Sequence, residues 1–394
     1  MADVVVKEGK VLPFIFRHPW VFRGALQEVV GPYQNGDVVR VIGPRHEFIA
    51  WGWINEHSKI TVRLISFQED FEERDWFLQK LENALHLRKR VLKLDKVTNS
   101  YRLVHSEGDG IPGLIVDKYG EYLVVQVSSL GLNRLIPVLV ERLSRESWVR
   151  GIVRRDDPVM CRMEAMEPVE ETLYGEDLPE RFLVEENQLL FEVDFRRCQK
   201  TGFYLDQREN RRFLASFVEG DIYALDAFCY TGGFAISLAK AGAGKVVAID
   251  SSRDALEQLK KNAQLNGVSN IVGVHDNVFR SLERYLYERE LFDIIVLDPP
   301  KFIPNKRSFE KGYAGYKKLN RRAISLVRSG GLLLTCCCSQ IMQESSFTRM
   351  LAEAAGEAGR EAMILARNFQ PADHPVSISC PEGGYLKTFL LKIF

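Results

Sequence analysis

The chain has 394 residues, of which 46% are hydrophobic and 10% aromatic, so it can form roughly two or three packed domains and is not a disordered tail protein. Lysine plus arginine and aspartate plus glutamate each number 53, and the net charge of zero excludes a uniformly basic nucleic-acid coat. No apolar run reaches the ~18 residues of a membrane span, and residues 1–10 lack the apolar core of a signal peptide, so we expect a cytoplasmic protein.

The first half of the chain predicts two small domains. Residues 1–70 hold short alternating strands between glycine, proline and asparagine turns, which is typical of a small β-barrel. The clearest of these strands cover 36–42, 48–54 and 60–65. Residues 71–190 add a helix over about 71–95, several strands and a second helix near 132–146, which together predict a central α+β domain.

The helix predicted over 71–95 carries a basic polar face. Its members are Lys80, Arg88, Lys89, Arg90, Lys93 and Lys96. Such a face is either simply solvated or a patch that follows nucleic-acid phosphates, and the sequence leaves both interpretations open.

Residues 191–394 contain a regular alternation of strands and helices from about residue 220. The strands cover 222–226, 246–250, 271–274, 292–298 and 332–336, and the helices 234–241, 253–266 and 345–358. Apolar strands with intervening helices predict a parallel sheet covered on both faces, which is a Rossmann-like α/β architecture. The last two strands, near 361–367 and 385–394, have no helix between them and are expected to pair antiparallel.

The predicted strand ends carry a candidate cofactor site, because doubly wound sheets bind ligands at the carboxyl ends of their strands. The loop after the first strand reads Asp226-Ala227-Phe228-Cys229-Tyr230-Thr231-Gly232-Gly233. Its glycine pair lets the backbone approach a ligand, and Asp250 ends the next strand where a ribose hydroxyl pair would bind. The loop lacks the Gly-x-Gly-x-x-Gly fingerprint of dinucleotide sites, and Asp226 would repel a pyrophosphate but accept a hydrogen bond from a methionine ammonium. We therefore expect S-adenosylmethionine rather than a dinucleotide.

The third strand is followed by Asp276 and Asn277. Either side chain is placed to hydrogen-bond the adenine amino group of such a cofactor. The alternative is a local turn residue that bonds only its own backbone.

The fourth strand ends in Asp298-Pro299-Pro300-Lys301, and the two prolines predict a rigid loop that holds Asp298 beside the methyl donor. Many amino-group methyltransferases have an aromatic residue directly after Asp/Asn-Pro-Pro. Here Lys301 stands in that position, which disfavours methylation of an amine. Lys301 is instead a candidate for lowering the pKa of a nearby thiol.

Seven cysteines are present, three of them adjacent, and no Cys-x-x-Cys pair exists, so neither a disulfide framework nor a metal site is expected. The fifth strand ends in Cys336, Cys337 and Cys338, of which Cys338 is nearest the strand end and best placed to reach a substrate. A thiolate is needed for methylation at carbon 5 of a pyrimidine, because its addition to carbon 6 makes carbon 5 nucleophilic. Asp298 would then bind N3 and the exocyclic amine of a cytosine. The structural alternative is that all three are small buried residues.

These motifs resemble the large-subunit rRNA cytosine-C5 methyltransferases that carry an N-terminal PUA domain. The similar segments are Arg17-His18-Pro19-Trp20-Val21-Phe22, Tyr101-Arg102-Leu103-Val104-His105, Gln199 to Arg208, Asp226 to Phe234, Leu297 to Phe302, Cys337-Cys338-Ser339 and Pro381 to Lys387. They span nearly the whole chain. Cys336, Cys337 and Gln340 depart from the family pattern around its cysteine.

The resemblance implies a class I methyltransferase sheet, a PUA β-barrel that binds RNA, and Cys338 as the nucleophile. It also implies that Phe203, Asp206, Gln207 and Arg208 close over the cofactor. The partner expected is large-subunit rRNA, with a homodimer left open. Between positions 301 and 322, basic residues alternate with Tyr313 and Tyr316, which suits RNA contacts. They are Lys301, Lys306, Arg307, Lys311, Lys317, Lys318, Arg321 and Arg322.

Three other functions remain open. A 5-methyluridine-forming enzyme uses the same cysteine chemistry, and an enzyme that methylates a purine amine would use Asp298, Pro299 and Pro300. A non-catalytic RNA-binding factor in ribosome assembly could keep the same fold.

Overall fold

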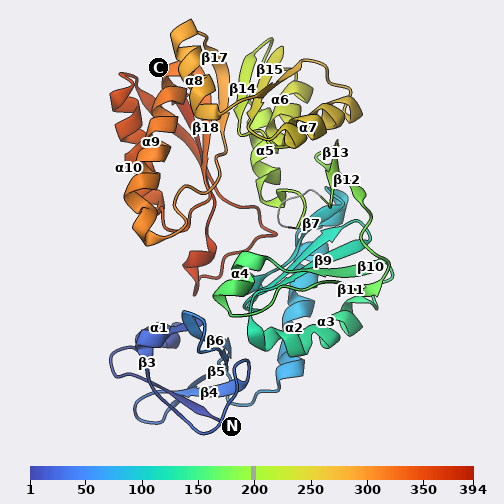
Figure 1. Ribbon diagram of the computed structural model, residues 1–394, viewed down its shortest axis with the longest axis vertical. Helices are drawn as coiled ribbons and strands as arrows, with labels where there is room; N and C mark the ends of the chain where they lie inside the picture. The colour runs from blue at the N-terminus through green and yellow to red at the C-terminus, as the bar shows by residue number, and fades with distance from the viewer. Residues whose placement is uncertain (197–200) are drawn as a thin grey trace. The chain divides into compact units, whose positions relative to one another are not determined.

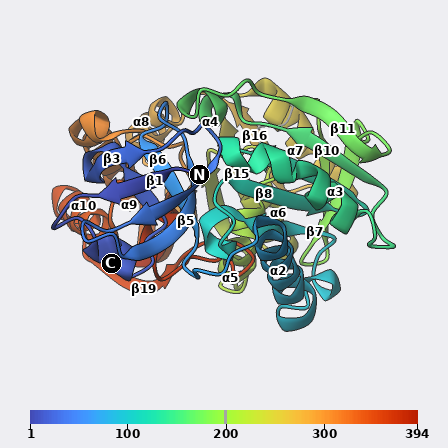
Figure 2. The ribbon, with the colours of Figure 1, turned by 90° about the horizontal axis from the view of Figure 1, so that it is seen from below.

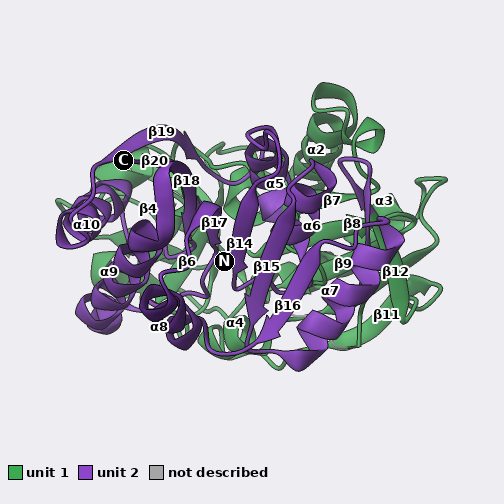
Figure 3. Ribbon diagram, turned by 90° about the horizontal axis from the view of Figure 1, so that it is seen from above, with its two compact units in different colours: residues 1–184, 193–205, 372–383 green, residues 185–192, 206–371, 384–394 purple. Residues whose placement is uncertain are grey.

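The computed structural model describes residues 1–196 and 201–394, so Cys198, Gln199 and Lys200 lie outside the described residues. Two compact units divide the chain (Figure 3). Unit 1 contains residues 1–184, 193–205 and 372–383, and unit 2 contains residues 185–192, 206–371 and 384–394. Among the described residues, no helix combines the length and the apolar character that a membrane crossing requires.

Unit 1 begins with a six-stranded sheet of mostly antiparallel strands, visible in blue in Figures 1 and 2. The strands are β1 Asp3–Val6, β2 Trp20–Phe22, β3 Leu26–Val30, β4 Val38–Ile42, β5 Phe48–Ile54 and β6 Ile60–Ser66. Alternate residues such as Val39, Val41, Val62 and Leu64 point into one core, as the alternation in the sequence predicts. The short helix α1, Leu12–Ile15, contributes Phe14 to that core.

A second sheet of five strands, in the order β11-β10-β9-β8-β7, follows in unit 1. Its strands are β7 Ser100–His105, β8 Leu114–Tyr119, β9 Tyr122–Val127, β10 Gly151–Arg155 and β11 Glu170–Gly175, and its helices α2 Glu73–His86, α3 Ile136–Leu143 and α4 Pro158–Met163. Phe77 and Leu81 of α2 recur at helical spacing and are fully buried. The helix predicted over 71–95 ends earlier as an α-helix, in a π-helical turn over Leu87–Val91.

Part of the basic face predicted on the helix over 71–95 consists of residues that form ion pairs within the protein. Arg88 has no exposed side-chain surface; its guanidinium bonds both carboxylate oxygens of Asp109 at 2.5 and 2.8 Å and donates to two backbone carbonyls, of Arg102 and Asp373. Lys89 pairs with Glu146 at 2.6 Å. The phosphate-patch interpretation is therefore wrong at Arg88 and Lys89, because acids distant in sequence already bind both cations.

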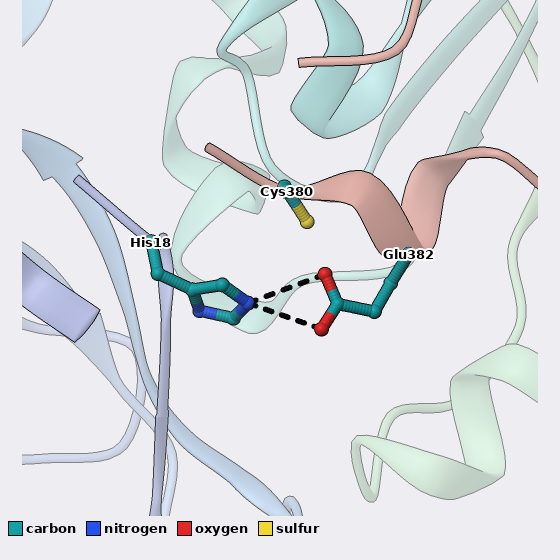
Figure 4. A group of neighbouring side chains, drawn as sticks. All are labelled: His18, Cys380 and Glu382. Atoms are coloured by element: carbon teal, nitrogen blue, oxygen red, sulfur yellow. Dashed lines mark hydrogen bonds and ion pairs between the residues drawn. The ribbon is translucent and has the colours of Figure 1, made fainter. Parts of the chain in front are cut away.

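Residues 372–383 belong to unit 1, and they make polar contacts with its N-terminal segment. The His18 Nε2 lies 3.3 Å from both carboxylate oxygens of Glu382, beside the thiol of Cys380 (Figure 4). These three groups are close enough to hold a metal ion. However, the backbone N–H of Trp20 donates to His18 Nδ1, so Nε2 carries the proton of the neutral ring and donates to Glu382. The imidazole is thereby committed on both nitrogens, which favours a hydrogen-bonded anchor over a metal site.

The core of unit 2 is a seven-stranded sheet in the order β16-β15-β14-β17-β18-β20-β19 (Figure 3). Its strands are β14 Tyr223–Ala227, β15 Lys245–Asp250, β16 Ile271–His275, β17 Phe292–Leu297, β18 Val327–Cys337, β19 Ala362–Asn368 and β20 Lys387–Ile393. The first five are parallel, and β20 runs antiparallel to both β18 and β19. The predicted Rossmann-like sheet and the antiparallel pairing of the last two strands are confirmed.

Helices cover both faces of this sheet. They are α5 Arg208–Ala215, α6 Gly233–Lys240, α7 Arg253–Leu265, α8 Val278–Glu288, α9 Phe309–Leu326 and α10 Glu344–Glu357. Leu214, Phe234 and Leu259 of α5 to α7 pack on one face, and Leu282 and Phe347 of α8 and α10 belong to the core on the other. A small hairpin, β12 Arg181–Glu186 and β13 Leu189–Asp194, precedes α5.

Replacing Arg88 by Met should destabilise unit 1 by about 3–5 kcal/mol, because the carboxylate of Asp109 would stay buried without its partner. Urea unfolding followed by circular dichroism measures the loss. The double variant Arg88→Met with Asp109→Leu should regain much of it, since no unpaired charge remains. Equal loss in the single and double variants would contradict this explanation.

Candidate active site

The carboxyl ends of five parallel strands bring the predicted site residues to one edge of the unit 2 sheet. Asp226 is the last residue but one of β14, and Asp250 is the last residue of β15. β16, β17 and β18 end directly before Asp276, Asp298 and Cys338. Strand direction and order alone therefore gather residues that span more than a hundred positions of sequence.

Asp226 is a buried carboxyl group with an unused acceptor. Its Oδ2 accepts the Ala235 N–H at 2.9 Å, within the first turn of α6. Its Oδ1 is buried and has no hydrogen-bond partner among the described residues. Burial raises the pKa of Asp226 to about 7. An unsatisfied buried acceptor is costly, so this oxygen is suited to a ligand that donates a hydrogen bond, above all a cation.

The loop between β14 and α6 has a strained backbone. Phe228 and Tyr230 adopt left-handed conformations, with φ of 66° and 48°, which non-glycine residues seldom do. Gly232 has φ of 90°, and a Cβ on it would lie 2.7 Å from the Leu259 side chain. Strain of this kind concentrates at binding sites, where the surrounding structure holds it in place. Gly233 then begins α6.

Asp250 is fixed by two backbone donors. Its Oδ2 accepts the N–H of Tyr230 at 2.9 Å and its Oδ1 that of Ser252 at 2.8 Å. Each oxygen keeps a second lone pair, so the oriented carboxylate can still accept from a pair of hydroxyls, as a ribose offers.

Asp276 and Asn277 have local structural roles. The Asn277 side chain caps α8 by accepting the Arg280 N–H at 3.3 Å. Asp276 accepts the Ser281 hydroxyl at 2.8 Å, and this bond is the main cause that lowers its pKa. Both roles match the turn interpretation, and the adenine contact stays a prediction.

The residues expected to close over the cofactor each have a protein partner. Within unit 1, the Phe203 N–H donates to the Tyr119 hydroxyl at 2.9 Å. In unit 2, Asp206 accepts the Tyr385 hydroxyl at 2.7 Å. Arg208 is buried, with its Nε 3.3 Å from Glu209. Their cofactor roles remain predictions.

Gln207 orients the catalytic strand ends. Its Nε2 donates to Asp298 Oδ2 at 3.0 Å and lies 3.6 Å from the Cys336 sulfur. Asn210 donates to Gln207 Oε1 at 2.7 Å and to the Thr388 hydroxyl at 3.2 Å. Sequence reasoning missed Asn210 and Thr388, since no local motif links α5 to β20.

The three adjacent cysteines have different surroundings. Cys336 and Cys337 are buried on opposite faces of the sheet, and burial raises the pKa of both thiols. Cys338 lies one residue beyond β18 and is half-buried, with its sulfur 4.0 Å from the carbonyl oxygen of Pro299. The structure therefore places the thiol of Cys338, the one of the three that is not fully buried, against the carbonyl of Pro299 in the Asp298-Pro299-Pro300 loop. Lys301, by contrast, is exposed.

The basic stretch after this loop forms η7 (Lys306–Ser308) and α9, and the fold already engages three of the residues expected to contact RNA. Tyr316 is fully buried in the core and cannot stack on a base. Lys317 pairs with Glu357 at 2.9 Å, and buried Arg322 donates to the Phe279 carbonyl. Exposed positions that remain are Lys301, Lys306, Arg307, Lys311 and Lys318.

Comparison with known proteins identifies the family of this chain. The profile of S-adenosylmethionine-dependent methyltransferases matches residues 154–389, and that of a PUA-like domain matches residues 4–67. The chain belongs to the S-adenosylmethionine-dependent methyltransferase family. It is 37% identical to "Ribosomal RNA large subunit methyltransferase I" of Aeromonas hydrophila and of Cronobacter sakazakii, over 99% of each chain. The resemblance noted from the motifs, including its PUA-like barrel, is confirmed.

Solved structures show the same fold over the full length of this methyltransferase. A SAM-dependent methyltransferase from Streptococcus mutans superposes with a TM-score of 0.85 at 21% identity, covering all of both chains. A methyltransferase complexed with SAH gives 0.86, also at 21% identity and full coverage.

S-adenosylmethionine is the cofactor of this family, and the residues present fit it. The unpaired Oδ1 of Asp226 suits the ammonium of its methionine part, and the fixed carboxylate of Asp250 suits its ribose hydroxyls. When bound, the cofactor supplies an electrophilic methyl group. The acids Asp226, Asp250 and Asp298 at the same edge favour a cationic ligand.

Cofactor binding by this methyltransferase should weaken at low pH. The pKa of Asp226 is about 7 and the ammonium of the ligand favours the carboxylate form, so affinity is present above that pKa and is lost as pH falls through it. Binding of SAH, measured by calorimetry, should be about tenfold weaker at pH 6 than at pH 8. Asp226→Asn should bind weakly at both values. A wild-type affinity that does not change with pH would contradict this assignment.

Proposed function

We propose that this methyltransferase transfers a methyl group to carbon 5 of a cytosine in large-subunit rRNA, in the cytoplasm, with Cys338 as the nucleophile. The observation that carries the proposal is the half-buried Cys338 sulfur beside the Pro299 carbonyl, at the edge where Asp226 and Asp250 lie. The rRNA substrate is supported by relatives that share 37% identity over nearly the whole chain and by the PUA-like barrel.

The chemistry assigns a task to each residue. The Cys338 thiolate forms a bond to carbon 6 of the cytosine, and the electron pair of the 5,6 double bond moves so that carbon 5 can attack the methyl group. Asp298, oriented by Gln207, accepts a hydrogen bond from the cytosine's exocyclic amine, and from N3 once that nitrogen takes up a proton as the thiolate adds. After transfer, a base removes the carbon 5 proton, the double bond re-forms, and the bond between carbon 6 and sulfur breaks to return the thiolate. A base within a helix must first flip out of its stack.

Packing around Phe302 favours carbon over amine methylation. An amine methyltransferase of the Asp-Pro-Pro type stacks an aromatic residue of this loop on the target base. Phe302 instead packs on Tyr316, with ring centroids 4.7 Å apart, and on Phe279 at 6.1 Å. Its ring is thus partly buried and packed against the protein core. Methylation of uridine at carbon 5 would use the same cysteine and is separated from the proposal by the product.

Cys338→Ala should lower methyl transfer by at least about a thousandfold, because the covalent step is lost. Nucleoside mass spectrometry of rRNA from cells that lack the protein, complemented with each variant, measures 5-methylcytidine. RNA containing 5-fluorocytidine should trap a covalent complex with the wild type and not with this variant.

Cys337→Ala is the matched control, since this neighbouring thiol is fully buried in the core and cannot reach a substrate; the variant should keep most of the activity. Full activity of Cys338→Ala would contradict the covalent mechanism. Loss of 5-methyluridine in place of 5-methylcytidine would favour the uridine alternative.

Replacing Lys306 and Lys311 by Glu should weaken RNA binding and reduce its salt dependence, since two exposed cations after the catalytic loop would no longer contact phosphates. The slope of log affinity against log salt should fall in magnitude by about 1.5. Lys245→Glu, which lies exposed at the opposite end of β15, is the control and should change little. An unchanged slope in the double variant would remove this surface from the RNA site.

A further inference from the structure

Lys387 is a buried lysine at the start of β20. Only 4% of its surface is exposed, and it is paired in register with Cys337, the last residue of β18. Its ammonium donates to the carbonyl of Ser339 at 2.9 Å and to that of Tyr385 at 3.0 Å. The ammonium therefore binds the carbonyl of the residue that directly follows Cys338.

The charge of this ammonium has no carboxylate partner in the described residues, where no ion pair within 4.0 Å includes Lys387. Two carbonyl oxygens offset only part of the cost of burying an ammonium. Burial lowers the pKa of Lys387, and the thiols of Cys337 and Cys338 act in the opposite direction. A buried cation kept beside thiols is suited to a thiolate formed there.

The same contacts fix the catalytic loop. Ser339 is fully buried, and its hydroxyl donates to the carbonyl of Ile303 at 2.7 Å. The Cys338 sulfur lies against Pro299 at the start of that loop. Lys387 thus binds the carbonyl of Ser339, and the hydroxyl of Ser339 in turn binds the loop that follows Asp298.

We propose that Lys387 is a positioning residue for Cys338: it fixes the carbonyl of the next residue, Ser339, and favours the thiolate form of Cys338. The role rests on the proposed function, in which Cys338 is the nucleophile. Cys337 is not the thiol served, because it is fully buried. Lys301, the cation expected from the sequence, is exposed and so is screened by solvent.

Other titratable groups also face Cys338. They are the phenol of Tyr316 on α9, the thiols of Cys336 and Cys337 on β18, and Asp298 before Pro299; Glu344 and Lys301 face Lys387. None of these groups except the two lysines supplies positive charge. Variants of the two lysines therefore separate their contributions.

The test is the pH dependence of Cys338 alkylation by iodoacetamide in the full-length protein, read at this residue by peptide fragmentation. Lys387→Met should move the midpoint of the rate upward by about one pH unit, which is about tenfold slower labelling at pH 7. Lys387→Gln, which keeps a donor for the carbonyls but no charge, should give the same shift. Lys387→Arg and Lys301→Met should keep the wild-type midpoint.

An unchanged midpoint in folded Lys387→Gln, with SAH binding intact, would overturn the proposal and leave Lys387 a packing role only. A shift in Lys301→Met alone would overturn it in favour of Lys301. The labelling needs neither RNA nor methyl transfer. An active Cys338→Ala would therefore reject the proposed function without deciding the effect of Lys387 on the thiol, so the two failures are distinguishable.

Discussion

The catalytic edge depends on one topological constraint: the reversal of a single strand in an otherwise parallel sheet. Parallel strands contribute their last residues to this edge, which is why Asp226, Asp250 and Asp298 meet there. β20 runs the other way, so it contributes its first residues, Lys387 and Thr388, to the same edge. The reversed strand thus supplies a cation and a hydroxyl where parallel strands supply mostly acids.

The ionisable side chains at this edge are held by neutral hydrogen-bonding groups. Gln207 holds Asp298 through a neutral amide donor, which orients the carboxyl group without itself adding a charge. Asp226 is held by one backbone N–H and keeps an unused oxygen. Lys387, at the start of β20, contributes a buried cation that binds the carbonyls of Ser339 and Tyr385. In the proposed reaction, acids near the methyl donor and a cation near the Cys338 thiolate match the charges that the chemistry requires.

The fold and most strand-end residues could be predicted because their signals are local. Apolar runs and glycine turns indicated the sheet, and Cys338 followed from the alternation of side chains along β18. The errors share one cause, a partner far away in sequence. Arg88 is bound by Asp109, and Lys317 by Glu357 on α10. A single sequence shows the basic residue but not the acid or the core that the fold brings to it, and for the same reason Lys387 was missed as a neighbour of Cys338.

Three adjacent cysteines then have a simple explanation in the register of the sheet. Cys336 and Cys337 are the last two residues of β18 paired with β20, opposite Thr388 and Lys387, so backbone hydrogen bonds hold them and the two cores bury them. Cys338 is the first residue beyond the ladder. Its backbone is not fixed by strand pairing, and the side chains of Lys387 and Ser339 take over that task. A nucleophile one residue beyond a strand is more accessible to substrate than one within it. Its position is then fixed by side-chain hydrogen bonds, because the backbone hydrogen bonds between paired strands no longer fix it.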